Sequence, residues 1–163
     1  MLSLTVTQST DLAQRYAELA DEIDAVLEAE QNQVARMATV AAMLANAFDH
    51  YFWTGFYAVD PERPGQLVIG PYQGTLGCLR IDFGRGVCGA AAARRETVIV
   101  ADVHAFADHI ACDSRSRSEI VVPVVDGSGA LIAVLDVDST ALAAFGEADA
   151  AGLEAIVRRV FAA

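Results

Sequence analysis

The chain has 163 residues, 54% of them hydrophobic and 20% charged, and a formal net charge of -11 at pH 7. This size and composition predict a single domain, residues 1–163, with enough apolar side chains to form a core without crosslinks. All eleven basic residues are arginines, and a protein this acidic has no electrostatic attraction to phosphate backbones or anionic lipid. We therefore expect no nucleic-acid partner and no membrane partner.

The apolar pattern and the cysteine count indicate the compartment. No apolar run approaches the roughly 18 residues that cross a bilayer. Residues 1–8 show neither a basic start nor a small-residue cleavage site. Three cysteines, an odd number, argue against a secreted disulfide framework. We expect a cytoplasmic protein, in which cysteines that pair do so transiently, during catalysis or sensing.

The N-terminal region, from about residue 10 to 48, has helical periodicity. A break near Gln31 and Asn32 divides the pattern into two helices or bends one long helix. The apolar positions are Leu12, Tyr16, Leu19, Ile23, Val26 and Leu27 before the break, and Val34, Met37, Val40, Met43, Leu44 and Phe48 after it. We interpret both stripes as packing faces without a chemical role.

Strand signals dominate from residue 51 to 138, the predicted sheet core. Aromatic and β-branched residues between turn signals predict strands over 51–59, 66–72, 78–81, 97–101, 119–125 and 130–138. A short helix is predicted over 90–95 and a closing helix over about 147–161. Because hairpin-like connections outnumber crossovers, we predict an α+β fold with a mainly antiparallel central sheet and N- and C-terminal helices packed on it.

The long polar connection over residues 102–118 is the first candidate for function, since such connections are uncommon inside compact domains. It holds Cys112 among His109, Asp113, Arg115 and Arg117. A core cysteine tends to have apolar neighbours. Basic neighbours lower the pKa of a thiol if they outweigh the acidic ones. The sequence therefore predicts a reactive thiolate at Cys112.

The other two cysteines carry weaker signals. Cys88 follows Gly84, Arg85 and Gly86 at an expected helix N-terminus, where free amides and the positive end of the helix dipole favour a thiolate. Cys78 follows a glycine on a strand end and is the least activated. For both, an inert thiol is the alternative.

Other kinds of site match the sequence less well. Cys88, His104, His109 and Cys112 are zinc-ligand types, but their spacing matches no compact zinc motif, and we expect no metal. The Gly-x-Gly-x-x-Gly string that begins at Gly84 lacks the strand–helix–strand frame of a nucleotide site. No Gly-x-Ser-x-Gly elbow is present for serine hydrolysis.

A group of carboxylates is the second candidate. Asp136 and Asp138 are two residues apart on a strand and point to the same face. Antiparallel pairing can bring Glu119, at the start of the neighbouring strand, close to them. A carboxyl group crowded by two others has a raised pKa and can hold a proton at neutral pH. The functional interpretation is a pocket that binds an ammonium group or donates a proton, and the alternative is a solvated strand end.

Trp53 is the only tryptophan, and it either fills the core or forms an aromatic wall for a small apolar group.

Together, the cysteines, the carboxylates and Trp53 resemble the free methionine-(R)-sulfoxide reductases, which are small GAF-domain enzymes. The matching stretches are Trp53 to Tyr57, Gly70 to Gly74, Gly84 to Gly89, Asp102 to Phe106, His109 to Pro123 and Val134 to Ser139. The resemblance covers nearly the whole chain, includes all three cysteines, and implies a GAF fold.

The resemblance also implies a mechanism. Cys112 would be the nucleophile that attacks the sulfoxide sulfur and becomes a sulfenic acid, which condenses with a second cysteine to a disulfide. Cys78 is the expected resolving cysteine, with Cys88 as the alternative. Thioredoxin or another dithiol would restore the thiols by exchange, and no cofactor is expected.

For the pocket, the resemblance implies that Glu119, Asp136 and Asp138 hold the substrate's amino group and polarise or protonate its sulfoxide oxygen. Trp53 would pack against the substrate's methyl group. The sequence departs from the family at Ala107 and Asp108, where the family usually has Pro-Gly, which predicts a more mobile loop and an added negative charge near the nucleophile.

Two other functions remain as alternatives: a non-catalytic GAF module that binds a small molecule, and a redox sensor whose cysteines form a regulatory disulfide. The carboxylates have no purpose in the redox sensor. An exposed N-terminal helix pair is compatible with a homodimer.

Overall fold

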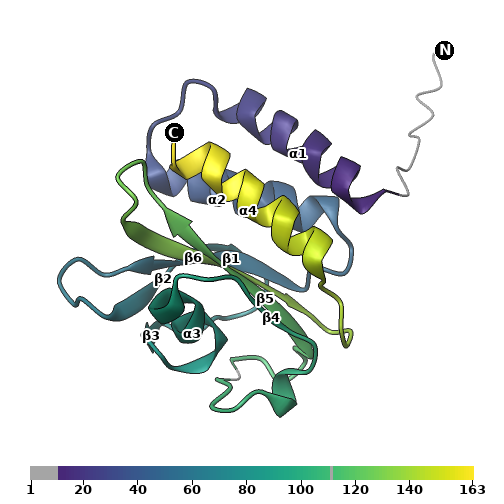
Figure 1. Ribbon diagram of the computed structural model, residues 1–163, viewed down its shortest axis with the longest axis vertical. Coiled ribbons are helices and arrows are strands. Elements are labelled where there is room, and N and C mark those ends of the chain that lie inside the picture. Colours follow the sequence, from purple (N-terminus) through teal and green to yellow (C-terminus); the bar gives the residue numbers. More distant parts are fainter. Residues whose placement is uncertain (1–10, 111) are drawn as a thin grey trace.

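The computed structural model describes residues 11–110 and 112–163 of the chain (Figure 1). Its helices and strands are α1 (Leu12–Leu27), α2 (Gln33–Ala47), β1 (Trp53–Val59), β2 (Gln66–Gln73), β3 (Arg80–Asp82), α3 (Gly86–Arg94), β4 (Val98–Val100), the 3-10 helix η1 (Val103–Ala105), β5 (Ser118–Val125), β6 (Leu131–Ser139) and α4 (Glu147–Phe161). The strands form one sheet in the order β3-β2-β1-β6-β5-β4, and every neighbouring pair is antiparallel. The predicted α+β fold with an antiparallel sheet is confirmed.

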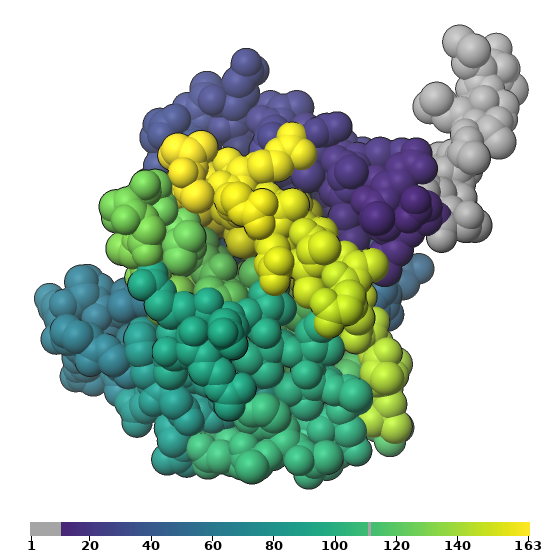
Figure 2. Space-filling model, in the orientation of Figure 1, coloured from purple at the N-terminus to yellow at the C-terminus, as the bar shows by residue number. Residues whose placement is uncertain are grey.

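Helices cover both faces of the sheet. Figure 1 shows α1, α2 and α4 on one side and α3 on the other. The yellow surface of α4 lies against the purple surface of α1 in Figure 2. Arg159 of α4 forms ion pairs with Asp21 and Asp24 of α1. Each face therefore has its own hydrophobic core.

The central strands alternate between these two cores. In β6, Leu135 packs with the three-helix side, whereas Val134 packs with the α3 side. Successive side chains of a strand point to opposite faces. Asp136 and Asp138 therefore lie on the α3 face together with Val134. A carboxylate on this strand enters a core, because neither face of the sheet is open to solvent here.

Most of the predicted elements are confirmed. The region from about residue 10 to 48 forms two helices, and the side chain of Asn32 caps the second by accepting a hydrogen bond from the Ala35 amide. Each predicted strand is present with ends within two residues of the prediction. Among the described residues, no helix is long and apolar enough to cross a membrane.

Two local predictions were wrong. The helix expected over 90–95 begins at Gly86, so Cys88 lies inside its first turn. Gly89 allows a close approach within this helix, since a Cβ there would collide with the carbonyl oxygen of Asp82. Cys78 lies in the loop before β3 and not on the strand, which begins at Arg80.

Candidate active site

A pocket opens on the α3 side of the sheet, beside the loop over 74–79 and the loop over 106–117. Six residues singled out from the sequence line it: Trp53, Cys88, Cys112, Glu119, Asp136 and Asp138. The seventh, Cys78, is joined to Cys112 by a disulfide. The fold therefore brings together side chains that are separated by up to 85 positions along the chain, from Trp53 to Asp138.

Strand register places the carboxylates. Glu119 of β5 lies directly opposite Asp138 of β6. On the other side of β6, Asp138 lies opposite Trp53 of β1. Asp136 is two residues along β6 and points to the same face. The predicted proximity of Glu119 to the two aspartates is confirmed, and the aromatic ring of Trp53 is in the same row.

Glu119 and Asp136 are buried and Asp138 is half-buried, so the alternative of a solvated strand end is wrong. Glu119 and Asp136 are each 5% exposed. Burial, followed by the charges of Asp136 and Asp138, raises the pKa of Glu119 well above its usual range. Burial also raises the pKa of Asp136 to about 6, and burial with the charge of Asp136 raises the pKa of Asp138. These shifts favour the protonated form, in the direction expected for three crowded carboxyl groups.

The disulfide joins two loops at the edge of the pocket. The Cα atoms of Cys78 and Cys112 are 5.6 Å apart, within the usual range for a disulfide. Cys112 is exposed and Cys78 is half-buried. The bonded sulfurs are therefore on the side of the pocket that other molecules can reach.

Cys88 has a different environment from the one expected. It is the free cysteine, is buried, and has its Sγ 3.9 Å from Oε1 of Glu119. Burial and the charges of Asp136 and Glu119 raise the pKa of its thiol well above the usual value. The sequence prediction of a thiolate favoured by the helix N-terminus was wrong, because the dipole effect of a helix end is small beside burial among carboxylates.

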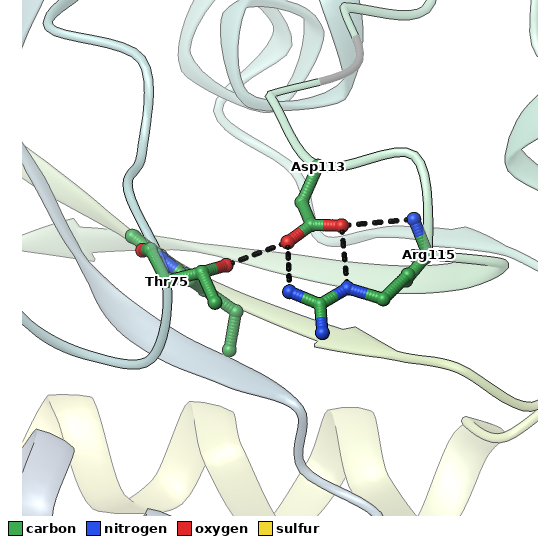
Figure 3. Close-up of polar contacts among 4 residues, drawn as sticks. Thr75, Asp113 and Arg115 are labelled. Atoms are coloured by element: carbon green, nitrogen blue, oxygen red, sulfur yellow. Dashed lines mark hydrogen bonds and ion pairs between the residues drawn. The ribbon is translucent and has the colours of Figure 1, made fainter.

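Asp113 ties the Cys112 loop to the Cys78 loop (Figure 3). Its carboxylate accepts hydrogen bonds from the Arg115 guanidinium at 2.8 and 3.1 Å, from the Arg115 amide at 2.9 Å and from the Thr75 hydroxyl at 2.8 Å. The Arg115 guanidinium also lies 4.9 Å from the centre of the Phe52 ring. Arg115 was expected to favour the Cys112 thiolate, but Asp113 neutralises its charge, and the pKa of Asp113 is lowered in return.

Trp53 anchors the loop that carries Cys78. Its indole nitrogen donates a hydrogen bond to the Thr75 carbonyl at 2.8 Å, and its ring stacks with those of Tyr57 and Tyr72. A Cβ at Gly77 would press on the indole ring. Trp53 is thus both a core residue and a pocket wall, so the two interpretations from the sequence hold together.

The remaining charged groups lie at the mouth of the pocket. The His109 Nε2 is 3.8 Å from Oε2 of Glu119, and burial lowers the pKa of His109. Arg85, which caps α3, donates a hydrogen bond to Asp108 at 2.6 Å. Asp108 has a φ of 64°, in the left-handed region that favours glycine. Its ion pair connects the divergent part of the Cys112 loop to α3.

The group able to hold a metal ion differs from the set considered in the sequence. Among the described residues, Cys88, Glu119 and Asp136 each offer a ligand atom within 4.8 Å of the others. Cys112 is bonded to Cys78, and His104 is exposed. Sequence spacing missed this group because its members come from α3, β5 and β6.

Sequence reasoning also missed the contact between Thr75 and Asp113 and the pocket residue Tyr57. Thr75 and Asp113 are 38 positions apart, and only the Asp-x-Arg spacing of Asp113 and Arg115 gave a local signal for their contact. Tyr57 lines the pocket, and its place four residues after Trp53 on the same strand puts both rings on one face. Burial, with the charge of Asp136, raises the pKa of Tyr57.

The fold and its buried pocket define a GAF domain, and the GAF domain family matches residues 11–163. The chain belongs to the GAF domain family. Within it, the chain is similar to proteins named free methionine-R-sulfoxide reductase. The Escherichia coli protein of that name is 41% identical over 145 residues, which cover 89% of this chain and 86% of the relative.

Other relatives agree in length and fold. GAF domain-containing protein A of Dictyostelium discoideum is 46% identical over 89% of each chain. The X-ray structure of free methionine-R-sulfoxide reductase from Neisseria meningitidis in complex with its substrate has a TM-score of 0.88 and 49% identity, covering 93% of this chain and 89% of that one. The predicted family resemblance and fold are therefore confirmed.

Proposed function

We propose that this chain reduces free methionine (R)-sulfoxide to methionine. The observation that carries the proposal is the combination, in one pocket, of an exposed Cys112 paired with Cys78 and three carboxyl groups, two of them buried and one half-buried. The relatives named free methionine-R-sulfoxide reductase support this choice of substrate. A non-catalytic module or a redox sensor would have no use for both the cysteine pair and the carboxyl groups.

In the first step, the Cys112 thiolate attacks the sulfoxide sulfur. The oxygen takes one proton from a neutral carboxyl group and passes to the Cys112 sulfur, which is oxidised by two electrons to a sulfenic acid as methionine leaves. Glu119 is suited to donate that proton, because its pKa is raised by burial and by the charges of Asp136 and Asp138.

A carboxylate binds the amino group of the substrate. Asp136 has a pKa of about 6 and is largely ionised at neutral pH, so it can pair with the substrate's ammonium. Asp138 lies in the same row between Glu119 and Trp53 and limits the orientations of the bound molecule. Trp53 provides an apolar wall for the methyl group.

In the second step, the Cys78 thiol condenses with the Cys112 sulfenic acid, which gives a disulfide and releases water. The Cα separation of 5.6 Å supports Cys78 as the resolving cysteine, and the burial of Cys88 beside Glu119 argues against the alternative. A dithiol partner such as thioredoxin then reduces the exposed disulfide by exchange, without a cofactor.

This cycle needs a reducing compartment, and we therefore place the chain in the cytoplasm. A homodimer remains a prediction, and the exposed Val26 and Val34, both near the α1–α2 connection, are candidates for its contact.

The proposal is tested by turnover of the separated sulfoxide epimers. With dithiothreitol or thioredoxin as reductant, methionine is expected from the R epimer of the free amino acid and not from the S epimer. Cys112→Ser is expected to abolish release while leaving the circular dichroism spectrum unchanged. A folded wild-type chain without turnover would contradict the proposal.

A further inference from the structure

Cys88 is buried in the pocket and has no part in the proposed cycle. We propose that Cys88, Glu119 and Asp136 form a binding site for a thiophilic divalent cation such as Zn²⁺. This site overlaps the carboxylates proposed to bind the substrate. Metal binding rests on the arrangement of these side chains alone, whereas its consequence for activity rests on the proposed function.

The geometry suits one ion. The three ligand atoms lie within 4.8 Å of one another, and the Cys88 Sγ is 3.9 Å from Oε1 of Glu119. Zinc binds sulfur at about 2.3 Å and carboxylate oxygen at about 2.0–2.2 Å, so two such atoms on one ion are at most about 4.5 Å apart. The Cys88–Glu119 pair fits without movement, and a small side-chain shift brings in Asp136.

The environment of Asp136 supports the site independently. Asp136 is only 5% exposed, and its buried Oδ1 has no hydrogen-bond partner among the described residues. A buried polar atom without a partner costs free energy. A bound cation would satisfy this oxygen. Arg85, the arginine that lines the pocket, is already paired with Asp108 at the mouth.

The ligand types select the metal. Thiolate is a soft ligand that favours zinc and similar ions, whereas magnesium and calcium take oxygen ligands. Binding displaces the Cys88 proton to solvent, because a thiol that coordinates a metal is deprotonated. The His109 Nε2, 3.8 Å from Oε2 of Glu119, or a water can complete a tetrahedral site.

The consequence for the proposed reductase is inhibition. A metal held by Glu119 removes the proposed proton donor, and a metal held by Asp136 removes the proposed partner of the substrate's ammonium. The ion is therefore a competitor of the substrate and not a cofactor.

The test uses the chain's small number of thiols. It has three cysteines, so Cys78→Ser with Cys112→Ser leaves Cys88 as the only thiol. Titration of this double variant with Co²⁺ is expected to give a thiolate-to-cobalt charge-transfer band that saturates at one ion per chain and is bleached by Zn²⁺. Adding Cys88→Ser is expected to abolish the band. Absence of the band in the double variant, or its persistence in the triple variant, would overturn the site.

The carboxylates are tested separately, in case the triple variant fails to fold. In the double-variant background, Glu119→Gln and Asp136→Asn are each expected to weaken Co²⁺ binding by roughly tenfold or more. Asp21→Asn, an exposed carboxylate on α1, is the matched control and should leave the affinity unchanged. Equal affinities in all three variants would overturn the assignment.

These titrations contain no sulfoxide, so the two proposals fail separately. A chain that reduces the sulfoxide but shows no Co²⁺ band contradicts the metal site only. A chain that binds Co²⁺ through Cys88 but releases no methionine contradicts the proposed function only.

Discussion

Glu119 and Asp138 lie directly opposite each other on β5 and β6, with both side chains on the face covered by α3. Two carboxyl groups at such a pair of positions repel each other when both are ionised. Desolvation and the charge of Asp136 raise the pKa of both groups, which favours their protonated forms. The strand register therefore favours a protonated carboxyl group in the pocket.

The first prediction separates the roles of the two best-defined carboxyl groups. Glu119→Gln is expected to lower kcat by about a hundred- to ten-thousand-fold, because it removes the general acid without changing shape. Asp136→Asn is expected to raise KM more than it lowers kcat, because it removes the charge that pairs with ammonium. Steady-state kinetics on the R epimer measure both, with Asp21→Asn as the control. Indistinguishable kcat and KM changes would contradict this division of roles.

The second prediction concerns stability and pH. The folded pKa values of Glu119 and Asp138 are raised above the unfolded value of about 4, so the folded state binds more protons and its stability falls as pH rises. The fall is at most about 1.4 kcal/mol per pH unit for each proton. The lowered pKa of His109 has the opposite effect on stability. His109 no longer titrates between about pH 7 and about pH 8.5, so we choose that range for the measurement.

Urea unfolding across that range measures the slope. Glu119→Gln should flatten it, because one of the protons no longer titrates, and Asp21→Asn should not. A wild-type slope of zero, or stability that rises with pH, would show that these carboxyl groups are ionised in the folded state.

The third prediction concerns the link between the two cysteine loops. Thr75→Val removes the hydroxyl that donates to Asp113 while keeping the side-chain shape. We expect a loss of about 1 kcal/mol in unfolding free energy. We also expect slower closure of the disulfide, seen as a sulfenic acid that dimedone traps for longer after one turnover. Thr97→Val, which removes a hydroxyl bonded to Glu154 outside the pocket, is the control. Unchanged trapping in Thr75→Val would show that the link does not hold the cysteines together.

The fourth prediction concerns packing between α4 and α1. Glycine to alanine inside a helix ordinarily stabilises it by up to about 1 kcal/mol. At Gly152 a Cβ would collide with the ring of Tyr16, whose hydroxyl is bonded to Tyr51 and Asp149. We expect Gly152→Ala to destabilise the protein by about 1–3 kcal/mol. Ala151→Gly, at the exposed neighbouring position, should cost about 1 kcal/mol from helix propensity alone. A stabilised Gly152→Ala in urea unfolding would contradict the packing.

The carboxylate row could be predicted from sequence because it depends on local periodicity. Asp136 and Asp138 share a face by the two-residue repeat of a strand, and one hairpin turn suffices to bring Glu119 beside them. The identity of the buried face was harder to predict. Both faces of β6 are covered, so the burial of Asp136 depends on α3, which packs there from a distant part of the chain.

The cysteine environments could not be predicted for the same reason. Helix position suggested an activated Cys88, but burial against Glu119 and Asp136 determines its thiol pKa. Charge composition suggested that Arg115 acts on Cys112, but Arg115 is paired with Asp113. Effects that arise from contacts between distant segments are not visible in spacing.

A single turnover without reductant tests the proposed cycle most directly. The reduced wild-type chain is mixed with excess free methionine (R)-sulfoxide, and released methionine is counted while the disulfide is mapped by mass spectrometry. We predict one methionine per chain and a new bond between Cys78 and Cys112, with Cys88 still a free thiol. Methionine release with a Cys88–Cys112 bond would contradict the resolving role of Cys78. No release from a folded, fully reduced chain would contradict the reductase itself.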